Sequence, residues 1–223
     1  MPEAVVFQGR VPPSVALALL ESLRDVDTPE GELFSDEDQP LNLRRRLGLS
    51  GVIGEQIARY SRLREGRDSL TAQEVASLFT LIARRTDSIE VFAEAGRRLV
   101  ARSFGRGSRG ARLGHRLLPG AVRRRRALRR IRRLATLVNP GAIVRVSRKP
   151  VRVTVERSLA VRAVEGGEGC ALLGGAIESV MNGFPNGGCR IVHARCEARS
   201  DPCCEWTLEP VVHASAEAGG PSG

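Results

Sequence analysis

Residues 169–210 read GCALLGGAIESVMNGFPNGGCRIVHARCEARSDPCCEWTLEP, and a helical periodicity gives way to a strand periodicity within them. Apolar side chains recur at helical spacing over 169–184, and Pro185-Asn186-Gly187-Gly188 then ends the helix. Two short strand-like runs follow, over 189–195 and 203–211, with a turn-forming Glu-Ala-Arg-Ser-Asp-Pro segment between them. The pattern therefore predicts one helix followed by one β-hairpin.

Three cysteines and one histidine in this stretch have the spacing Cys-x22-His-x2-Cys-x7-Cys; they are Cys170, His193, Cys196 and Cys204. Thiolates with an imidazole are typical of a tetrahedral Zn²⁺ site, and four protein ligands leave no open position. A zinc ion held in this way would be structural. Cys203 and Cys204 point to opposite faces of a strand, and only Cys204 fits the spacing. Burial of these cysteines as small apolar side chains, without metal, is the other interpretation.

The rest of the chain predicts more helices and a second hairpin. Apolar residues at spacings of three and four indicate helices over 14–23, 52–63, 71–82, 88–104 and 119–138. Thr71 and Glu74 form a capping box at the start of the third. β-branched runs at 143–146 and 151–155 predict two strands. We therefore expect an α/β (α+β) fold, a small antiparallel sheet covered by helices. Its expected parts are a helical extension over 1–86, an α/β domain over 87–212 and a disordered tail over 213–223.

Composition limits the class of protein. The 223 residues include five cysteines, an odd number that fits thiols and metal ligands better than a disulfide framework. No apolar run reaches the length of a membrane span, and the chain begins without the pattern of a secretion signal. We therefore expect a cytoplasmic protein with no transmembrane segment.

Three motifs in the C-terminal part together resemble one known family. They are Gly169-Cys170-x3-Gly174-Gly175-x-Ile177-x2-Val180, Cys189-Arg190-Ile191-Val192-His193-x2-Cys196 and Asp201-x2-Cys204-x-Trp206-x-Leu208. The combination, over roughly residues 140–210, resembles the 4-vinyl reductase domain. That family shares its fold with subunits of the TRAPP trafficking complex. It includes zinc-containing phenol sensors of bacterial transcription activators and proteins linked to bacteriochlorophyll synthesis.

The resemblance implies a TRAPP-like homodimer with a structural zinc on Cys170, Cys196 and Cys204, and with His193 where the family usually has Glu. The turn Arg199-Ser200-Asp201 replaces the family's Gly-Asp. The implied function is binding of a small hydrophobic or aromatic ligand between the sheet and its helices, in a sensing, regulatory or carrier role. We expect this pocket to be lined by Phe92, Leu99, Leu128, Ile131 and Ile177. The alternative within the family is a tetrapyrrole vinyl reductase or its accessory protein.

Positive charge is concentrated in the middle of the chain. The net charge is +10, yet 19 of the 35 Lys and Arg residues lie between Glu94 and Glu156, where no acidic residue occurs. The predicted basic surface on helix 119–138 consists of Arg123, Arg124, Arg125, Arg126, Arg129, Arg130 and Arg133. The region 97–133 has three possible interpretations. It could be a solvated face or an interface with an acidic protein, it could bind nucleic acid without sequence specificity, or it could contact anionic lipid. No aromatic residue lies in 106–133 to stack on a base.

Catalytic patterns are weak. No nucleophile has a base and an orienting group at a recognisable spacing, and there is no Walker-type loop. The run Gly105-x-Gly107-x2-Gly110 follows a predicted helix where a dinucleotide-binding turn would follow a strand. The sequence therefore favours a binding protein over an enzyme.

Overall fold

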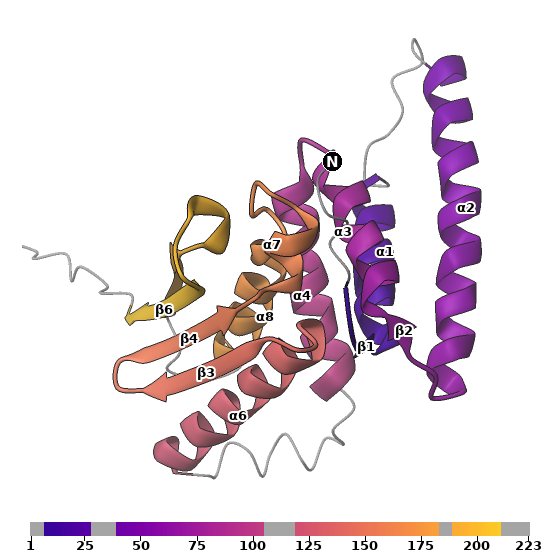
Figure 1. Ribbon diagram of the computed structural model, residues 1–223. Coiled ribbons are helices and arrows are strands. Elements are labelled where there is room, and N and C mark those ends of the chain that lie inside the picture. Colours follow the sequence, from indigo (N-terminus) through magenta and orange to yellow (C-terminus); the bar gives the residue numbers. More distant parts are fainter. Residues whose placement is uncertain (1–6, 28–38, 105–118, 183–188, 211–223) are drawn as a thin grey trace, which may run out of the picture.

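The computed structural model describes residues 7–27, 39–104, 119–182 and 189–210 (Figure 1). The tail predicted to be disordered, 213–223, lies outside these residues. Seven α-helices are described: α1 (Pro13–Asp27), α2 (Gln39–Glu65), α3 (Ala72–Ala83), α4 (Ser88–Phe104), α6 (Gly120–Val138), α7 (Leu159–Ala163) and α8 (Cys170–Asn182). A 3₁₀ turn, η1 (Glu197–Arg199), follows the strand β5.

The main sheet has four antiparallel strands, β3 (Ile143–Arg148), β4 (Val151–Glu156), β5 (Cys189–Arg195) and β6 (Cys204–Pro210). Their order is β3-β4-β6-β5, so the second hairpin joins the first through β6. A separate pair, β1 (Arg10–Val11) and β2 (Leu70–Thr71), is also antiparallel. Helices and antiparallel sheets are thus combined in one chain, which confirms the expected α+β class.

One face of the main sheet is buried against helices. Val151, Val153 and Val155 of β4 point to this face, as the alternation of buried and exposed positions shows. In the strand register, Val153 lies opposite Trp206 and Val155 opposite Cys204. Helix α8 packs against β5 and α6 against β3, so these helices cover the sheet (Figure 1). Cys204 and Trp206 are therefore buried beneath α8 and not exposed to solvent.

Two glycines allow α4 and α8 to cross with their backbones in contact. A Cβ on Gly175 would lie 2.1 Å from the carbonyl oxygen of Ala93, and a Cβ on Gly96 would lie 2.0 Å from that of Leu172. Any larger side chain would push the helices apart. The crossing fixes α8 against α4, and α8 begins at Cys170.

The helices before α4 continue the same core. Helix α1 packs on α4, and α2 packs on α1 on the far side from the sheet (Figure 1). The side chain of Thr71 accepts a hydrogen bond from the backbone N–H of Glu74 at 3.2 Å, which is one half of the predicted capping box, and the carboxylate of Glu74 accepts a hydrogen bond from the hydroxyl of Tyr60. The division of the chain at residue 86 stays a prediction.

The sequence pattern does not predict the shortest elements. The five-residue helix α7 and the two-residue strands β1 and β2 are too short to show a period. The strands predicted at 143–146 and 151–155 extend to Arg148 and Glu156, whereas the helix predicted over 52–63 begins much earlier, at Gln39 of α2.

Candidate metal centre

Four side chains from three elements converge at the end of the sheet. Cys170 is the first residue of α8, His193 lies in β5, and Cys204 opens β6. Cys196 follows the end of β5, where the strand register shifts between His193 and Arg195 and the chain turns into η1. This irregularity brings Cys196 to the same side as His193, which a straight strand could not do.

The ligand atoms have the spacing of a tetrahedral metal site. One atom from each of Cys170, His193, Cys196 and Cys204 lies within 4.8 Å of every other. The Sγ of Cys170 is 3.8 Å from that of Cys196 and 3.7 Å from that of Cys204. A regular tetrahedron with zinc–sulfur bonds of about 2.3 Å places its sulfurs about 3.8 Å apart. The cluster could therefore hold a metal ion without rearrangement.

The chemistry of the donor set also fits a metal. Cys170, Cys196 and Cys204 are at most 3% exposed, and His193 is half-buried. The Nε2 atom of His193 is buried and has no hydrogen-bond partner among the described residues. A buried polar atom without a partner is costly, and coordination would satisfy it. The imidazole is held in place by stacking on Trp206, with ring centroids 4.8 Å apart and planes 12° from parallel.

Electrostatics within the cluster separate the three thiols. The pKa of Cys204 is lowered to about 5, first by the hydrogen bond from the Cys170 thiol and further by the nearby imidazole of His193. The hydrogen bond to Cys204 and burial raise the pKa of Cys170, and burial raises that of Cys196. Cys204 is thus the most readily ionised of the three thiols, because further negative charge in a buried site is unfavourable. A bound cation would remove that penalty.

The backbone around Cys196 is held by side chains outside the cluster. The carboxylate of Asp201 accepts a hydrogen bond from the backbone N–H of Cys196 at 2.8 Å. Ser200 has φ +66° in the left-handed region. Across the loop, Gly167 has φ +81°, and a Cβ there would come within 3.0 Å of the Cys196 sulfur. The left-handed backbone of Ser200 and the close approach of Gly167 to Cys196 cannot be inferred from the spacing of residues in the sequence.

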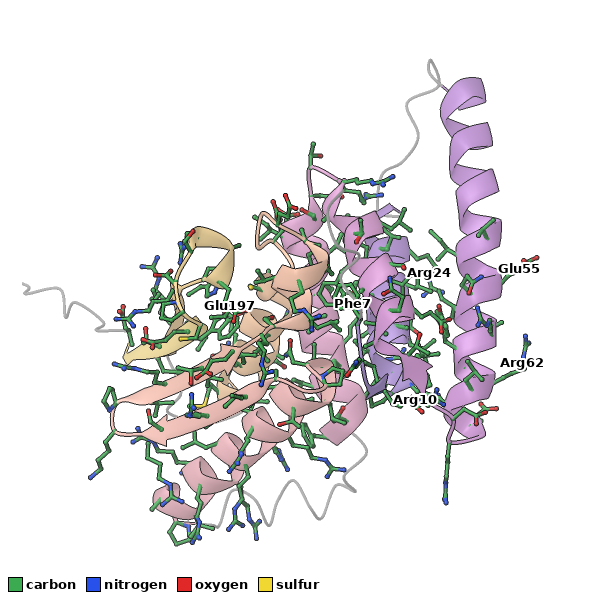
Figure 2. The ribbon with its side chains drawn as sticks, in the orientation of Figure 1. Phe7, Arg10, Arg24, Glu55, Arg62 and Glu197 are labelled. Carbon is green, nitrogen blue, oxygen red and sulfur yellow. The ribbon has the colours of Figure 1, made fainter. Side chains whose placement is uncertain are left out.

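Glu197 fastens the η1 turn to the chain after β4. Its carboxylate accepts hydrogen bonds from the backbone N–H groups of Arg157 at 2.6 Å and Ser158 at 2.9 Å. The side chain of Glu197 is labelled in Figure 2. The sequence alone does not single out Glu197, because the partners of its carboxylate lie about forty residues away in the chain.

A pocket of about 340 Å³ opens beside the cysteine and histidine cluster. Cys170, His193 and Trp206 form part of its wall, and α4 and α8 supply most of the remainder. Its other lining residues are Ile89, Ala93, Gly167, Glu168, Ala171, Gly174, Gly175, Glu178 and Ile191. Glu168 contributes a carboxylate oxygen that is buried and has no hydrogen-bond partner among the described residues. The wall is thus mainly apolar.

The five positions expected to line a ligand pocket lie in the hydrophobic core. Phe92, Leu99, Leu128, Ile131 and Ile177 are all at most 5% exposed. None of them borders the pocket beside the metal centre. Their periodicity marks the buried stripes of α4, α6 and α8, and a buried stripe meets other helices as readily as a cavity.

The predicted basic surface lies on α6. Arg124, Arg125, Arg126, Arg129 and Arg133 are exposed, while Arg123 and Arg130 are half-buried. Within the described part of the chain, no helix is long and apolar enough to cross a membrane.

Comparison of the chain with protein-family models, with curated proteins and with solved structures gives no match. The resemblance to the 4-vinyl reductase domain therefore stays a prediction from the motifs.

Proposed function

We propose that this chain is a zinc-stabilised protein that binds a small hydrophobic or aromatic ligand in the pocket beside its metal centre. The cluster of Cys170, His193, Cys196 and Cys204 is the observation that carries the proposal, with its tetrahedral sulfur spacing. Zinc would join the start of α8 to the ends of β5 and β6. Zinc is favoured over other cations because three thiolates and one imidazole suit its ligand preference.

The pocket and the metal centre share residues, which links ligand binding to the metal. Cys170 and His193 belong to both, and Trp206 stacks on His193 while lining the pocket. Zinc would fix this wall without touching substrate, since its four ligands are all protein side chains. An apolar pocket with a few polar groups is the usual form of a small-molecule site. The role is binding and sensing or transport, as in the phenol sensors that the motifs resemble.

Metal analysis of protein purified without chelator tests the zinc assignment. We expect one zinc per chain. Cys196→Ser and Cys204→Ser should each lower the zinc content well below one, because each removes a ligand and leaves an incomplete buried site. Cys203→Ser is the matched control, since Cys203 is adjacent in sequence but lies outside the cluster. Wild-type protein with much less than one zinc per chain would contradict the assignment.

The same centre can be examined with cobalt. Co²⁺ in place of zinc should give the intense visible absorption of a tetrahedral thiolate site, and His193→Glu should shift that absorption while keeping the metal. An octahedral cobalt spectrum would contradict the four-ligand geometry.

Trp206 provides a direct assay for the pocket, because it is the chain's one tryptophan. Titration of the zinc-loaded protein with a simple alkylphenol should change its fluorescence and saturate. Gly174→Leu should abolish the response, since Gly174 lines the pocket and a Cβ there has 3.6 Å of room before Trp206. Gly54→Leu on α2 is the control, because nothing lies within 4 Å of its Cβ position. If Gly174→Leu keeps both zinc and an unchanged phenol response, the ligand does not occupy this pocket.

A further inference from the structure

A second pocket lies on the basic helix α6 and shares no lining residue with the first. It has a volume of about 390 Å³ and is lined by Phe104, Arg126, Arg129, Arg130 and Arg133. We refer to these five residues as the arginine cleft. Arg129, Arg130 and Arg133 lie three, four and seven residues after Arg126, so the four arginines share one face of α6 over about 10 Å.

The charge of the arginine cleft is not neutralised within the described residues. None of its four guanidinium groups has a carboxylate partner there, and its lining contains no acidic residue. Arginines elsewhere in the molecule differ. Arg98 pairs with Asp25 and Arg102 with Glu21. Four adjacent cations without counter-charges repel one another, and an anionic partner would relieve that repulsion.

The structure argues against a lipid surface as this partner. A basic amphipathic helix binds a bilayer by inserting its apolar face. In α6 that face is the stripe Leu128, Ile131 and Leu134, which is at most 5% exposed and packs in the core. The side of α6 at the cleft therefore exposes guanidinium groups and no apolar stripe, and guanidinium groups bind phosphates.

Phe104 distinguishes between the remaining polyanions. Its ring comes from the end of α4, is half-buried, and lines the cleft with the guanidinium of Arg130 at 5.0 Å from the ring centroid. Aromatic rings and guanidinium planes are the surfaces on which unpaired bases stack. An acidic peptide would use only the charge, and in a duplex the bases are stacked on each other. The fold thus supplies the aromatic residue that the sequence of 106–133 lacks.

We propose that the arginine cleft binds single-stranded nucleic acid, with the arginines on successive phosphates and a base against Phe104. Recognition of this kind is independent of base sequence, because each contact is to a phosphate or to the face of a base.

The first test is binding of the full-length zinc-loaded protein to a fluorescein-labelled oligothymidylate, followed by anisotropy over a salt series. Four phosphate contacts predict that affinity falls about 50-fold between 50 and 200 mM salt through these contacts alone. Substitution of Arg126, Arg129, Arg130 and Arg133 by Gln should reduce the slope of log affinity against log salt by about 3. The matched control replaces Arg62, Arg64, Arg84 and Arg190 by Gln, which removes the same charge outside the cleft. Equal loss in both variants would overturn the cleft as the site.

The second test separates single strands from other polyanions. Phe104→Leu should weaken oligothymidylate binding about five-fold or more and leave the salt slope unchanged, since only stacking is lost. The same variant should bind duplex DNA and polyglutamate as the parent protein does. Retained zinc content and far-ultraviolet circular dichroism would show that each variant is folded. The proposal is overturned if polyglutamate or phosphatidylserine vesicles bind more tightly than oligothymidylate, or if Phe104→Leu has no effect.

Discussion

Replacing Gly175 by alanine tests the close crossing of α4 and α8, which sets the position of Cys170. The new Cβ would lie 2.1 Å from the carbonyl oxygen of Ala93 and 2.8 Å from the carbonyl carbon. Ordinary contacts of this kind are no closer than about 3.4 Å, so the helices must separate by roughly 1 Å. Both atoms belong to helical backbone, and no side-chain rotation can relieve the overlap.

Two opposing contributions set the size of the effect. Overpacking of a well-packed core costs about 1–3 kcal/mol, and the upper end applies here because backbone must move. Alanine in place of glycine within a helix regains up to about 1 kcal/mol. We therefore expect Gly175→Ala to lower the free energy of unfolding by about 2 kcal/mol. Gly54→Ala in α2 meets no atom within 4 Å and should raise it by up to about 1 kcal/mol.

Urea unfolding of the zinc-loaded proteins, followed by circular dichroism, measures both changes. Gly96→Ala should resemble Gly175→Ala, because its Cβ would lie 2.0 Å from the carbonyl oxygen of Leu172 at the same crossing. The double variant should cost less than the sum, since helices already separated by one substitution accommodate the other. A Gly175→Ala protein as stable as the parent, or more stable, would refute the close backbone contact.

Two further predictions concern buried polar groups. The hydroxyl of Tyr60 donates to Glu74 at 3.0 Å, and burial followed by this hydrogen bond raises the Tyr60 pKa to about 12. The folded state then holds the proton more tightly than the unfolded chain, so stability should fall by up to about 2–3 kcal/mol between pH 10 and 12. Urea unfolding over this range should show no such loss in Tyr60→Phe. Asn139 is 2% exposed, and its Oδ1 accepts a hydrogen bond from the backbone N–H of Leu159 at 2.9 Å. Asn139→Ala should cost about 2–3 kcal/mol in urea unfolding, whereas Thr136→Ala on the exposed side of α6 should change stability by about 0.5 kcal/mol or less.

The elements with a strong period were predictable from the sequence. Helix α4 has the predicted bounds 88–104, and α6 begins one residue after the predicted start at 119. These helices carry complete apolar stripes; in the sequence, Gly105 follows the pattern of α4, and Pro119 and Pro140 flank that of α6. The order β3-β4-β6-β5 could not be read in the same way, because strand periodicity reports which face is buried and not which strand lies alongside.

The metal cluster shows how far residue type and spacing reach. Strand alternation allows only one of Cys203 and Cys204 to join the cluster, the spacing selects Cys204, and the structure brings Cys204 into the cluster. The contributions of Asp201 and Gly167 depend on the loop conformation around Cys196, and no spacing rule contains that conformation. The local sequence indicates which side chains form the cluster. The contacts that hold those side chains in place depend on the assembled fold.

The two pockets carry this distinction further. Phe92 and Ile177 were placed at a ligand site because their apolar stripes face inward, and the same property buries them at 0% exposure in the core. Conversely, Phe104 had no predicted role, because it is the last residue of α4 and separate from the arginine run. Only the packing of α4 with the rest of the helical layer brings its ring to Arg130. By itself, the basic helix α6 could attract any polyanion through charge. Phe104 adds a ring on which a nucleic-acid base could stack, and the Phe104→Leu comparison measures the contribution of that ring.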